Sequence, residues 1–268
     1  MGYRRRRMGG LDPLMPRRGG FVGAYDAFAA SLAHAYEPAR RTLTAYTGNL
    51  LRLRRASDDA ESDFGYVANG DLDVVAIAAW LGGANGYVKT VYDQTTNADH
   101  VTQTTAAQQP LFVESAYSGH AGMYFDSSKL TGAFTNGGAL SQPFNVFAVI
   151  QIDVGLLADG GNHYITDGDD VTNRMIVGKA SGVSNPWTIN AGTILSSGVP
   201  NTDWHIFSAR FDGASSQFWI DGISVITGNA GAHNADGIAI GASYFGVVAP
   251  WKGYIASVVI CDPALADY

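Results

Sequence analysis

The chain has 268 residues, of which 46% are hydrophobic and only 15% charged, and its formal net charge is −7. Residues 1–57 hold 11 of the 17 basic residues and carry a net charge of +8, so the rest of the chain carries −15. The hydrophobic content argues against disorder, and the acidic body argues against a uniformly basic nucleic-acid-binding protein. The single cysteine, Cys261, excludes an internal disulfide, and the sequence has no Cys/His cluster with zinc spacing.

Residues 1–20 are the most basic segment, with six arginines and one aspartate. A segment of this composition cannot bury its own surface, so we expect an extended arm that orders against an acidic partner surface. The arginines expected to dock the arm are Arg4, Arg5, Arg6, Arg7, Arg17 and Arg18. A frayed tail without a role is the alternative. No apolar signal-peptide segment and no run of 18 apolar residues is present, which predicts a soluble protein that folds in a cytoplasm.

Two helices are expected in the first third of the chain. Residues 26–44 place large apolar side chains near helical spacing, with Pro38 as a point where the helix should end or kink. Residues 72–81 predict a second helix that begins after an aspartate and stops at a glycine pair. Between them, residues 50–55 alternate Leu and Arg in the manner of a strand.

From residue 144 onwards, short β-branched and apolar runs are separated by Gly, Asp and Asn. The expected strands are 145–152, 163–165, 174–177, 187–189, 205–211, 217–220, 223–226, 237–240 and 253–261. Such spacing argues for an antiparallel sandwich, and Asp221-Gly222 fits a two-residue type I′ hairpin turn. We therefore expect an arm (1–20) and a single domain (21–268), in which a mixed helical and irregular part (21–113) packs on the sandwich body (114–268).

Residues 203–226 resemble the central hairpin of concanavalin A-like and laminin-G-like jelly-roll domains. The resemblance rests on Trp204-His205, Phe211-Asp212-Gly213 and Ile220-Asp221-Gly222. The later stretches 238–241 and 251–260 are similar to the closing strands of that fold. This resemblance implies a mainly β protein, a concanavalin A-like antiparallel β-sandwich (jelly roll) with short N-terminal helices and an extended basic arm.

The first half of the chain is similar to the opening segment of arabinofuranosidase B catalytic domains, and it also resembles a block in structural proteins of tailed bacteriophages. The similar stretches are 46–48, 53–65, 91–97 and 106–110. The first resemblance implies a nucleophilic Glu in the sandwich body, an acid after a Gly-Gly pair, and two vicinal cysteines. This chain has no Glu beyond Glu114, has Gly241-Ala242-Ser243 at the second position, and has one cysteine. These departures predict a chain without hydrolytic activity, unless Asp170 or Asp236 takes over.

Three groups of residues are candidates for binding or charge chemistry. Sugar binding needs aromatic faces and planar polar groups, which lie in predicted loops at His163, Tyr164, Asn185, Trp187, Tyr244, Phe245 and Trp251, although a core or interface role stays open for them. Trp204 is excluded, because the hairpin resemblance places it facing the core. Ca²⁺ could bind Asp167, Asp169 and Asp170, but without EF-hand spacing a surface turn and no cofactor are favoured. The charge cluster over residues 54–63 favours structural ion pairs.

Taken together, these patterns favour a non-catalytic virion structural protein of a tailed phage or phage-like particle, such as a tail fibre, spike or head decoration. Its arm would contact other virion proteins, and its body would bind host-surface carbohydrate. We expect a homo-oligomer assembled in the bacterial cytoplasm, without membrane insertion or nucleic-acid binding. An arabinofuranosidase-like glycoside hydrolase and a purely architectural capsid or tail subunit are the alternatives.

Overall fold

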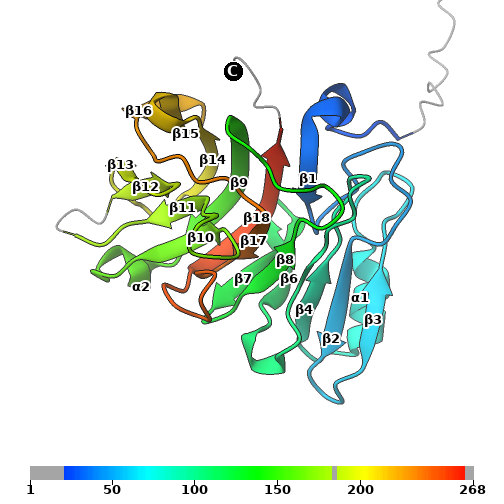
Figure 1. Ribbon diagram of the computed structural model, residues 1–268. Helices are drawn as coiled ribbons and strands as arrows, with labels where there is room; N and C mark the ends of the chain where they lie inside the picture. The colour runs from blue at the N-terminus through cyan, green and yellow to red at the C-terminus, as the bar shows by residue number, and fades with distance from the viewer. Residues whose placement is uncertain (1–20, 183–185, 263–268) are drawn as a thin grey trace, which may run out of the picture.

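The structure is a computed structural model that describes residues 21–182 and 186–262 (Figure 1). The expected arm with its six arginines, and Asn185, lie outside these residues. Within the described ranges, eighteen strands form one continuous network of antiparallel pairs that folds over into two packed layers. No helix in the same ranges is long and apolar enough to cross a membrane.

The first layer is built around the long strand β18. Its strands in spatial order are β16 (Ile223–Gly228), β15 (Ser216–Ile220), β14 (Trp204–Phe211), β9 (Phe144–Ile152) and β18 (Lys252–Cys261). The far edge of β18 pairs with β7 (His120–Asp126) along residues 252–255 and with β1 (Leu32–Tyr36) along residues 258–261. Beyond β7 lies β6 (Leu111–Tyr117).

The second layer covers the inner face of the first. Its order is β13 (Ile194–Ser197), β12 (Trp187–Asn190), β11 (Ile176–Lys179), β10 (His163–Asp167), β17 (Gly237–Ile240), β8 (Leu130–Ala133) and β5 (Val101–Thr102). Strand β4 (Gly86–Val91) pairs with both β5 and β6 and so joins the layers, and β2 (Leu51–Arg55) and β3 (Glu61–Phe64) continue from it. Figure 1 shows β2 and β3 on the opposite side of the molecule from β10 to β13.

The helical elements are short. They are α1 (Val74–Leu81), α2 (Val154–Leu157) and the 3₁₀ turns Asp26–Ser31, Ala106–Gln108 and Gly213–Ser215. The expected helix over 72–81 is confirmed by α1, where the Asp73 carboxylate accepts a hydrogen bond from the Ala76 amide. Gly82 ends α1 in a left-handed conformation, which a residue without Cβ adopts at little cost.

Aromatic side chains between the layers form the core. The Trp187 ring of β12 lies 4.8 Å from the Phe207 ring of β14 and 6.3 Å from the Trp251 ring. Strand β14 shows the period of two that a half-buried strand requires, since Phe207, Ala209 and Phe211 are buried. The expected antiparallel sandwich is therefore present.

The expected helix over residues 26–44 is wrong. Only a 3₁₀ turn (Asp26–Ser31) forms there, and strand β1 follows it. Residues 33–39 are all buried, so β1 lacks the alternation by which a half-exposed strand is recognised, and its alanines imitate a helix. The surrounding segment 21–113, expected to be mixed helical and irregular, contains the five strands β1 to β5 together with α1.

Two local predictions from the sequence are confirmed. Asp221 and Gly222 have φ values of 53° and 77°, as a type I′ turn between β15 and β16 requires. The charge cluster at β2 and β3 consists of ion pairs, including Arg54 with Asp59 at 2.7 Å and Arg55 with Asp58 at 2.6 Å. These partly exposed pairs fix an irregular turn.

Candidate active site

Three aspartates meet where β10 ends and β17 begins. The two strands are antiparallel neighbours with Asp167 opposite Ala239, so the loop after β10 lies beside the residues that precede β17. Asp169 and Asp170 belong to that loop, and Asp236 directly precedes β17. Each of the three offers a carboxylate oxygen within 4.8 Å of the others. We call Asp169, Asp170 and Asp236 the carboxylate cluster.

Hydrogen bonds within the loop orient two of these carboxylates. Asp170 Oδ1 accepts bonds from the Thr172 amide (2.6 Å), the Thr172 hydroxyl (2.8 Å) and the Asn173 amide (2.9 Å), which makes it the cap of a tight turn. Asn173 Nδ2 donates to Asp170 Oδ2 at 3.2 Å and to Asp236 Oδ2 at 2.8 Å. The Asn173 amide therefore holds carboxylates from two distant parts of the chain at a fixed separation.

An internal ion pair anchors the loop to the sandwich. Asp167 is fully buried, and its two oxygens accept bonds from Arg174 Nε at 3.0 Å and Nη2 at 2.8 Å. The same carboxylate accepts bonds from the Ser243 hydroxyl and the Tyr244 amide, which ties the loop to the segment after β17. A bidentate pair of this kind is rigid, so the backbone on both sides of the carboxylate cluster is held in place.

The members of the cluster differ in proton affinity. Asp169 is an exposed residue, but partial desolvation and the hydrogen bond and charge of the neighbouring Asp236 carboxyl raise its pKa to about 7. Hydrogen bonds from Thr172 hold the pKa of Asp170 below its ordinary value. At neutral pH the site thus combines one carboxyl that can carry a proton with one that is ionised, which is the combination used in acid–base catalysis.

The residues expected to bind sugar separate into two groups. Tyr164 and Tyr244 flank the Arg174 guanidinium at 5.9 and 5.2 Å, and Phe245, 73% exposed, lies 6.3 Å from Tyr244. These three aromatic rings border the loop that carries the carboxylate cluster. Trp187 and Trp251 are 1% and 0% exposed in the core. Buried His163 donates from Nδ1 to the Pro250 carbonyl at 2.7 Å, and its Nε2 lies 3.4 Å from Asp159 Oδ2.

Of the three aspartates considered as Ca²⁺ ligands, Asp169 and Asp170 converge, and Asp167 does not join them. The Asp167 carboxylate already accepts hydrogen bonds from Arg174, Ser243 and Tyr244. Asp236 lies beside Asp169 and Asp170 instead. Three carboxylates at this spacing are chemically able to hold a hard divalent cation. Asp170 and Asp236 were each considered as a replacement acid, but their proximity depends on the pairing of β10 with β17, which has no local signal in the sequence.

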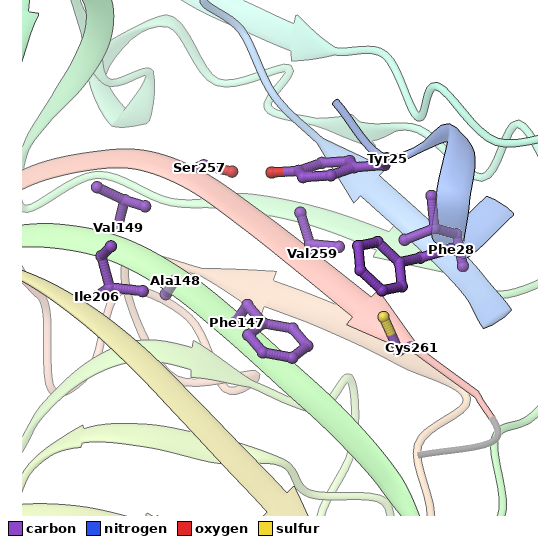
Figure 2. Close-up of a pocket in the computed structure, with 10 residues that line it drawn as sticks. Tyr25, Phe28, Phe147, Ala148, Val149, Ile206, Ser257, Val259 and Cys261 are labelled. Carbon is purple, nitrogen blue, oxygen red and sulfur yellow. The ribbon is translucent and has the colours of Figure 1, made fainter. Parts of the chain in front are cut away.

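A separate apolar groove lies on the outer face of the first layer (Figure 2). It encloses about 310 Å³ between Phe28, Phe147, Ile206 and the neighbouring side chains of β18. Figure 2 shows the Tyr25 and Ser257 hydroxyls facing each other across one end of the groove. None of the described residues that line it is a carboxylate or an imidazole, so the groove lacks groups for acid–base chemistry.

Comparison with known proteins places the fold among arabinofuranosidases. A structure of an arabinofuranosidase complexed with arabinofuranosyl-α-1,2-xylobiose matches 92% of this chain with a TM-score of 0.71 and 15% sequence identity. A GH54 α-L-arabinofuranosidase soaked with a cyclic sulfate inhibitor matches 89% with a TM-score of 0.68 and 14% identity. This chain spans 62% and 60% of the lengths of those two proteins. No curated protein matches the chain by sequence.

The fold is thus that of a β-sandwich domain found in glycoside hydrolases. The family model described as "Alpha-L-arabinofuranosidase B, catalytic" matches residues 24–194, which is more than half of the chain. The chain belongs to this family of catalytic domains. The matched range includes Asp169 and Asp170, and Asp236 lies beyond it.

Family membership overturns the main functional interpretation of the sequence. The resemblance to phage jelly-roll proteins, and with it the expected non-catalytic virion protein, tail fibre or decoration, is wrong, because the family and the similar structures are those of glycoside hydrolases. The expected place in a virion assembled in a bacterial cytoplasm is corrected on the same ground. The missing Glu and Gly-Gly-Asp positions predicted an inactive chain, with Asp170 or Asp236 as the exception; the fold brings these two carboxylates together.

Proposed function

We propose that this protein is an arabinofuranosidase-like glycoside hydrolase that acts on α-L-arabinofuranosides. The observation that carries the proposal is the convergence of the carboxylate cluster at one end of the sandwich, in a chain of the arabinofuranosidase B catalytic family. The separation of at most 4.8 Å between oxygens supports a retaining mechanism, which uses carboxyl groups about 5 Å apart, over an inverting one, which needs room for a water.

In the proposed mechanism, Asp169 is the general acid and Asp170 the nucleophile. The Asp169 carboxyl, with a pKa of about 7, donates its proton to the glycosidic oxygen as the bond to the leaving group breaks. The ionised Asp170 carboxylate attacks the anomeric carbon and forms a covalent glycosyl intermediate. Asp169, now ionised, takes a proton from a water molecule, which attacks the anomeric carbon and releases the sugar with retained configuration.

The remaining residues of the site have supporting roles in this proposal. Asp236 raises the proton affinity of Asp169, and Asn173 fixes the spacing of Asp170 and Asp236. A side chain at Gly237 would begin 2.5 Å from Asp169 Oδ2, so only glycine leaves room for that carboxyl. Tyr164, Tyr244 and Phe245 supply the aromatic faces against which a sugar ring can stack.

The experiment is hydrolysis of 4-nitrophenyl α-L-arabinofuranoside by the full chain and by single variants. Asp169→Asn is expected to lower kcat/KM by about 10²- to 10⁴-fold, the usual contribution of a general acid. Asp170→Asn is expected to abolish turnover, and added azide should restore bond cleavage by replacing the missing nucleophile. Asp59→Asn, in the exposed ion pair at β2, is the matched control and should leave the rate unchanged.

Two results would contradict the assignment. Wild-type protein that releases no nitrophenol from this substrate, at enzyme concentrations where a turnover per hour is measurable, would refute the activity itself. Full activity of both Asp169→Asn and Asp170→Asn would leave hydrolysis in place and refute the carboxylate cluster as its site.

A further inference from the structure

The outer face of the first layer carries a row of aromatic and amide side chains that the proposed hydrolysis does not use. Trp204 lies opposite Gln151, Gln151 opposite Tyr254, and Tyr254 opposite Tyr124 in the pairings of β14, β9, β18 and β7. Directly paired residues of neighbouring strands point to the same face, so these four side chains form one line across four strands. We call Trp204, Gln151, Tyr254 and Tyr124 the cross-strand row.

The row faces outward and not into the core. Its strand neighbours Ile150, Ile152 and Ile255 are buried between the layers, and the alternation of strand residues places Gln151 and Tyr254 on the opposite face. Trp204 is partly exposed and alternates with inward-facing His205 and Phe207 of β14. The sequence-based expectation that Trp204 faces the core is therefore wrong.

The aromatic rings of the row are in contact and are extended at one end. Tyr124 and Tyr254 meet edge to face at 5.1 Å, and Trp204 lies 5.6 Å from Tyr254. Tyr117, 38% exposed near the tip of the β6–β7 hairpin, lies 4.8 Å from Trp204. Four strands at a spacing of ~4.8 Å give the row a length of ~14 Å, enough for more than one sugar ring.

A cavity of about 310 Å³ opens beside three members of this row, Tyr124, Gln151 and Tyr254. It is lined by Tyr124, Gln151, Tyr254, Asp153 and Thr202 together with backbone of β18 and the start of α2. The Gln151 amide donates to the Thr202 carbonyl at 2.9 Å, and the Tyr124 hydroxyl donates to Asp153 Oδ2 at 3.0 Å. Aromatic faces are thus combined with an amide, a hydroxyl and a carboxylate that are held in fixed orientations.

The two carboxylates beside the cavity are hydrogen-bonded or ion-paired. Asp153 accepts bonds from the Tyr124 hydroxyl and, through Oδ1, from the Gly155 amide at the start of α2. Asp126, the next acidic residue along β7, pairs with Lys252 at 3.3 Å. An anionic ligand would meet the carboxylates of Asp153 and Asp126, and both oxygens of Asp153 already accept hydrogen bonds. The arrangement favours a neutral ligand with one apolar face and several hydroxyls, which describes a sugar.

We infer that the cross-strand row and Tyr117 form a binding site for neutral oligosaccharides, separate from the carboxylate cluster. The cluster lies at the end of β10 in the second layer, whereas the row crosses the outer face of the first layer. This inference does not rest on the proposed hydrolase activity. A chain that binds sugar at the row would hold a polymer without cleaving it there.

The test is binding of the full-length protein to an array of immobilised neutral and charged oligosaccharides, followed by titration of the best binder. The wild-type protein should bind neutral members. Trp204→Ala and Tyr117→Ala should each weaken binding by about tenfold, as expected for the loss of one stacking ring. Tyr117 is exposed near a hairpin tip, so its variant should fold even if Trp204→Ala does not.

Two control variants separate this site from the rest of the molecule. Phe28→Ala removes an exposed aromatic ring from the apolar groove on the same face, and Asp59→Asn changes an exposed ion pair at β2; both should bind like wild type. The inference is overturned if no neutral oligosaccharide binds, if only charged ones bind, or if folded Trp204→Ala and Tyr117→Ala both keep full affinity.

Discussion

Asp169 is the residue whose chemistry depends most on a neighbour that is distant in the sequence. Its carboxyl lies against Asp236, and partial desolvation together with this second carboxyl raises its pKa to about 7. The Asp170 carboxyl, in the same loop but bonded to Thr172, has its pKa lowered instead. Adjacent aspartates thus acquire opposite properties from contacts that only the folded chain provides.

The raised pKa of Asp169 beside Asp236 predicts a specific pH dependence of kcat/KM. A protonated Asp169 is needed as the acid, so kcat/KM should fall as the pH rises through about 7. Asp236→Asn removes the neighbouring charge, which lowers the pKa of Asp169 and should move this fall to lower pH by about one unit or more. Partial desolvation of Asp169 remains, so the shift should be incomplete. The measurement is kcat/KM against pH for both proteins, and an unmoved alkaline limb in Asp236→Asn would contradict it.

Single helices and strands could be predicted from the sequence where the contacts that stabilise them lie within a few residues. Helix α1 carries its own signals, since Asp73 caps it and Gly82 ends it within a few residues. Strand β1 forms because it pairs with β18, more than two hundred residues later, so the local sequence predicts a helix instead. The aspartates of the loop after β10 were visible in the sequence, but their partner Asp236 depends on β17 lying beside β10.

The loop that bears Asp169 and Asp170 should owe its shape to the pair of Asp167 and Arg174. Arg174→Ala leaves a buried carboxylate without its cation, and we expect it to lower the free energy of unfolding by about 2–4 kcal/mol. Arg210→Ala breaks a partly exposed pair with Asp212 and should cost at most about 1 kcal/mol. Urea denaturation measures the free energy of unfolding of both variants.

A second consequence concerns activity. Asp167→Asn combined with Arg174→Ala removes the unpaired charge and should recover part of the lost stability, but the loop would remain unanchored and hydrolysis weak. Equal unfolding free energies for Arg174→Ala and Arg210→Ala would show that the buried pair does not hold the loop.

At the scale of the whole molecule, β18 connects parts of the chain that are distant in sequence. One edge pairs with β9 along its length, and the other pairs first with β7 and then with β1. The inner side chains of β18, including Ile255, Val258 and Ile260, are buried against the second layer. The sandwich could be predicted from regularly spaced strands, whereas this order of pairing has no local signal and could not.

We therefore expect that a chain ending at Trp251 has no cooperative thermal transition. A synthetic peptide of residues 252–262, added in excess, should pair with β9, β7 and β1 and restore the transition, because it supplies every hydrogen bond of the missing strand. A peptide of the same composition in scrambled order is the control. Circular dichroism melts measure the outcome, and a cooperative melt of the truncated chain without any peptide would refute this role of β18.

Because β18 is the last strand to be synthesised, its partner strands remain incompletely paired while the chain is being made. Strand β9 ends at Ile152 and β18 begins at Lys252, so a ribosome adds about a hundred residues between them, which takes roughly 5–20 s. During that interval β7 has one edge unpaired, β9 has one edge unpaired once β14 has formed, and β1 lacks its partner strand; unpaired edges of this kind recruit strands from other chains. Slow or interrupted translation of this stretch should therefore produce aggregates, and the demand for chaperones should be greatest just before the final strand emerges.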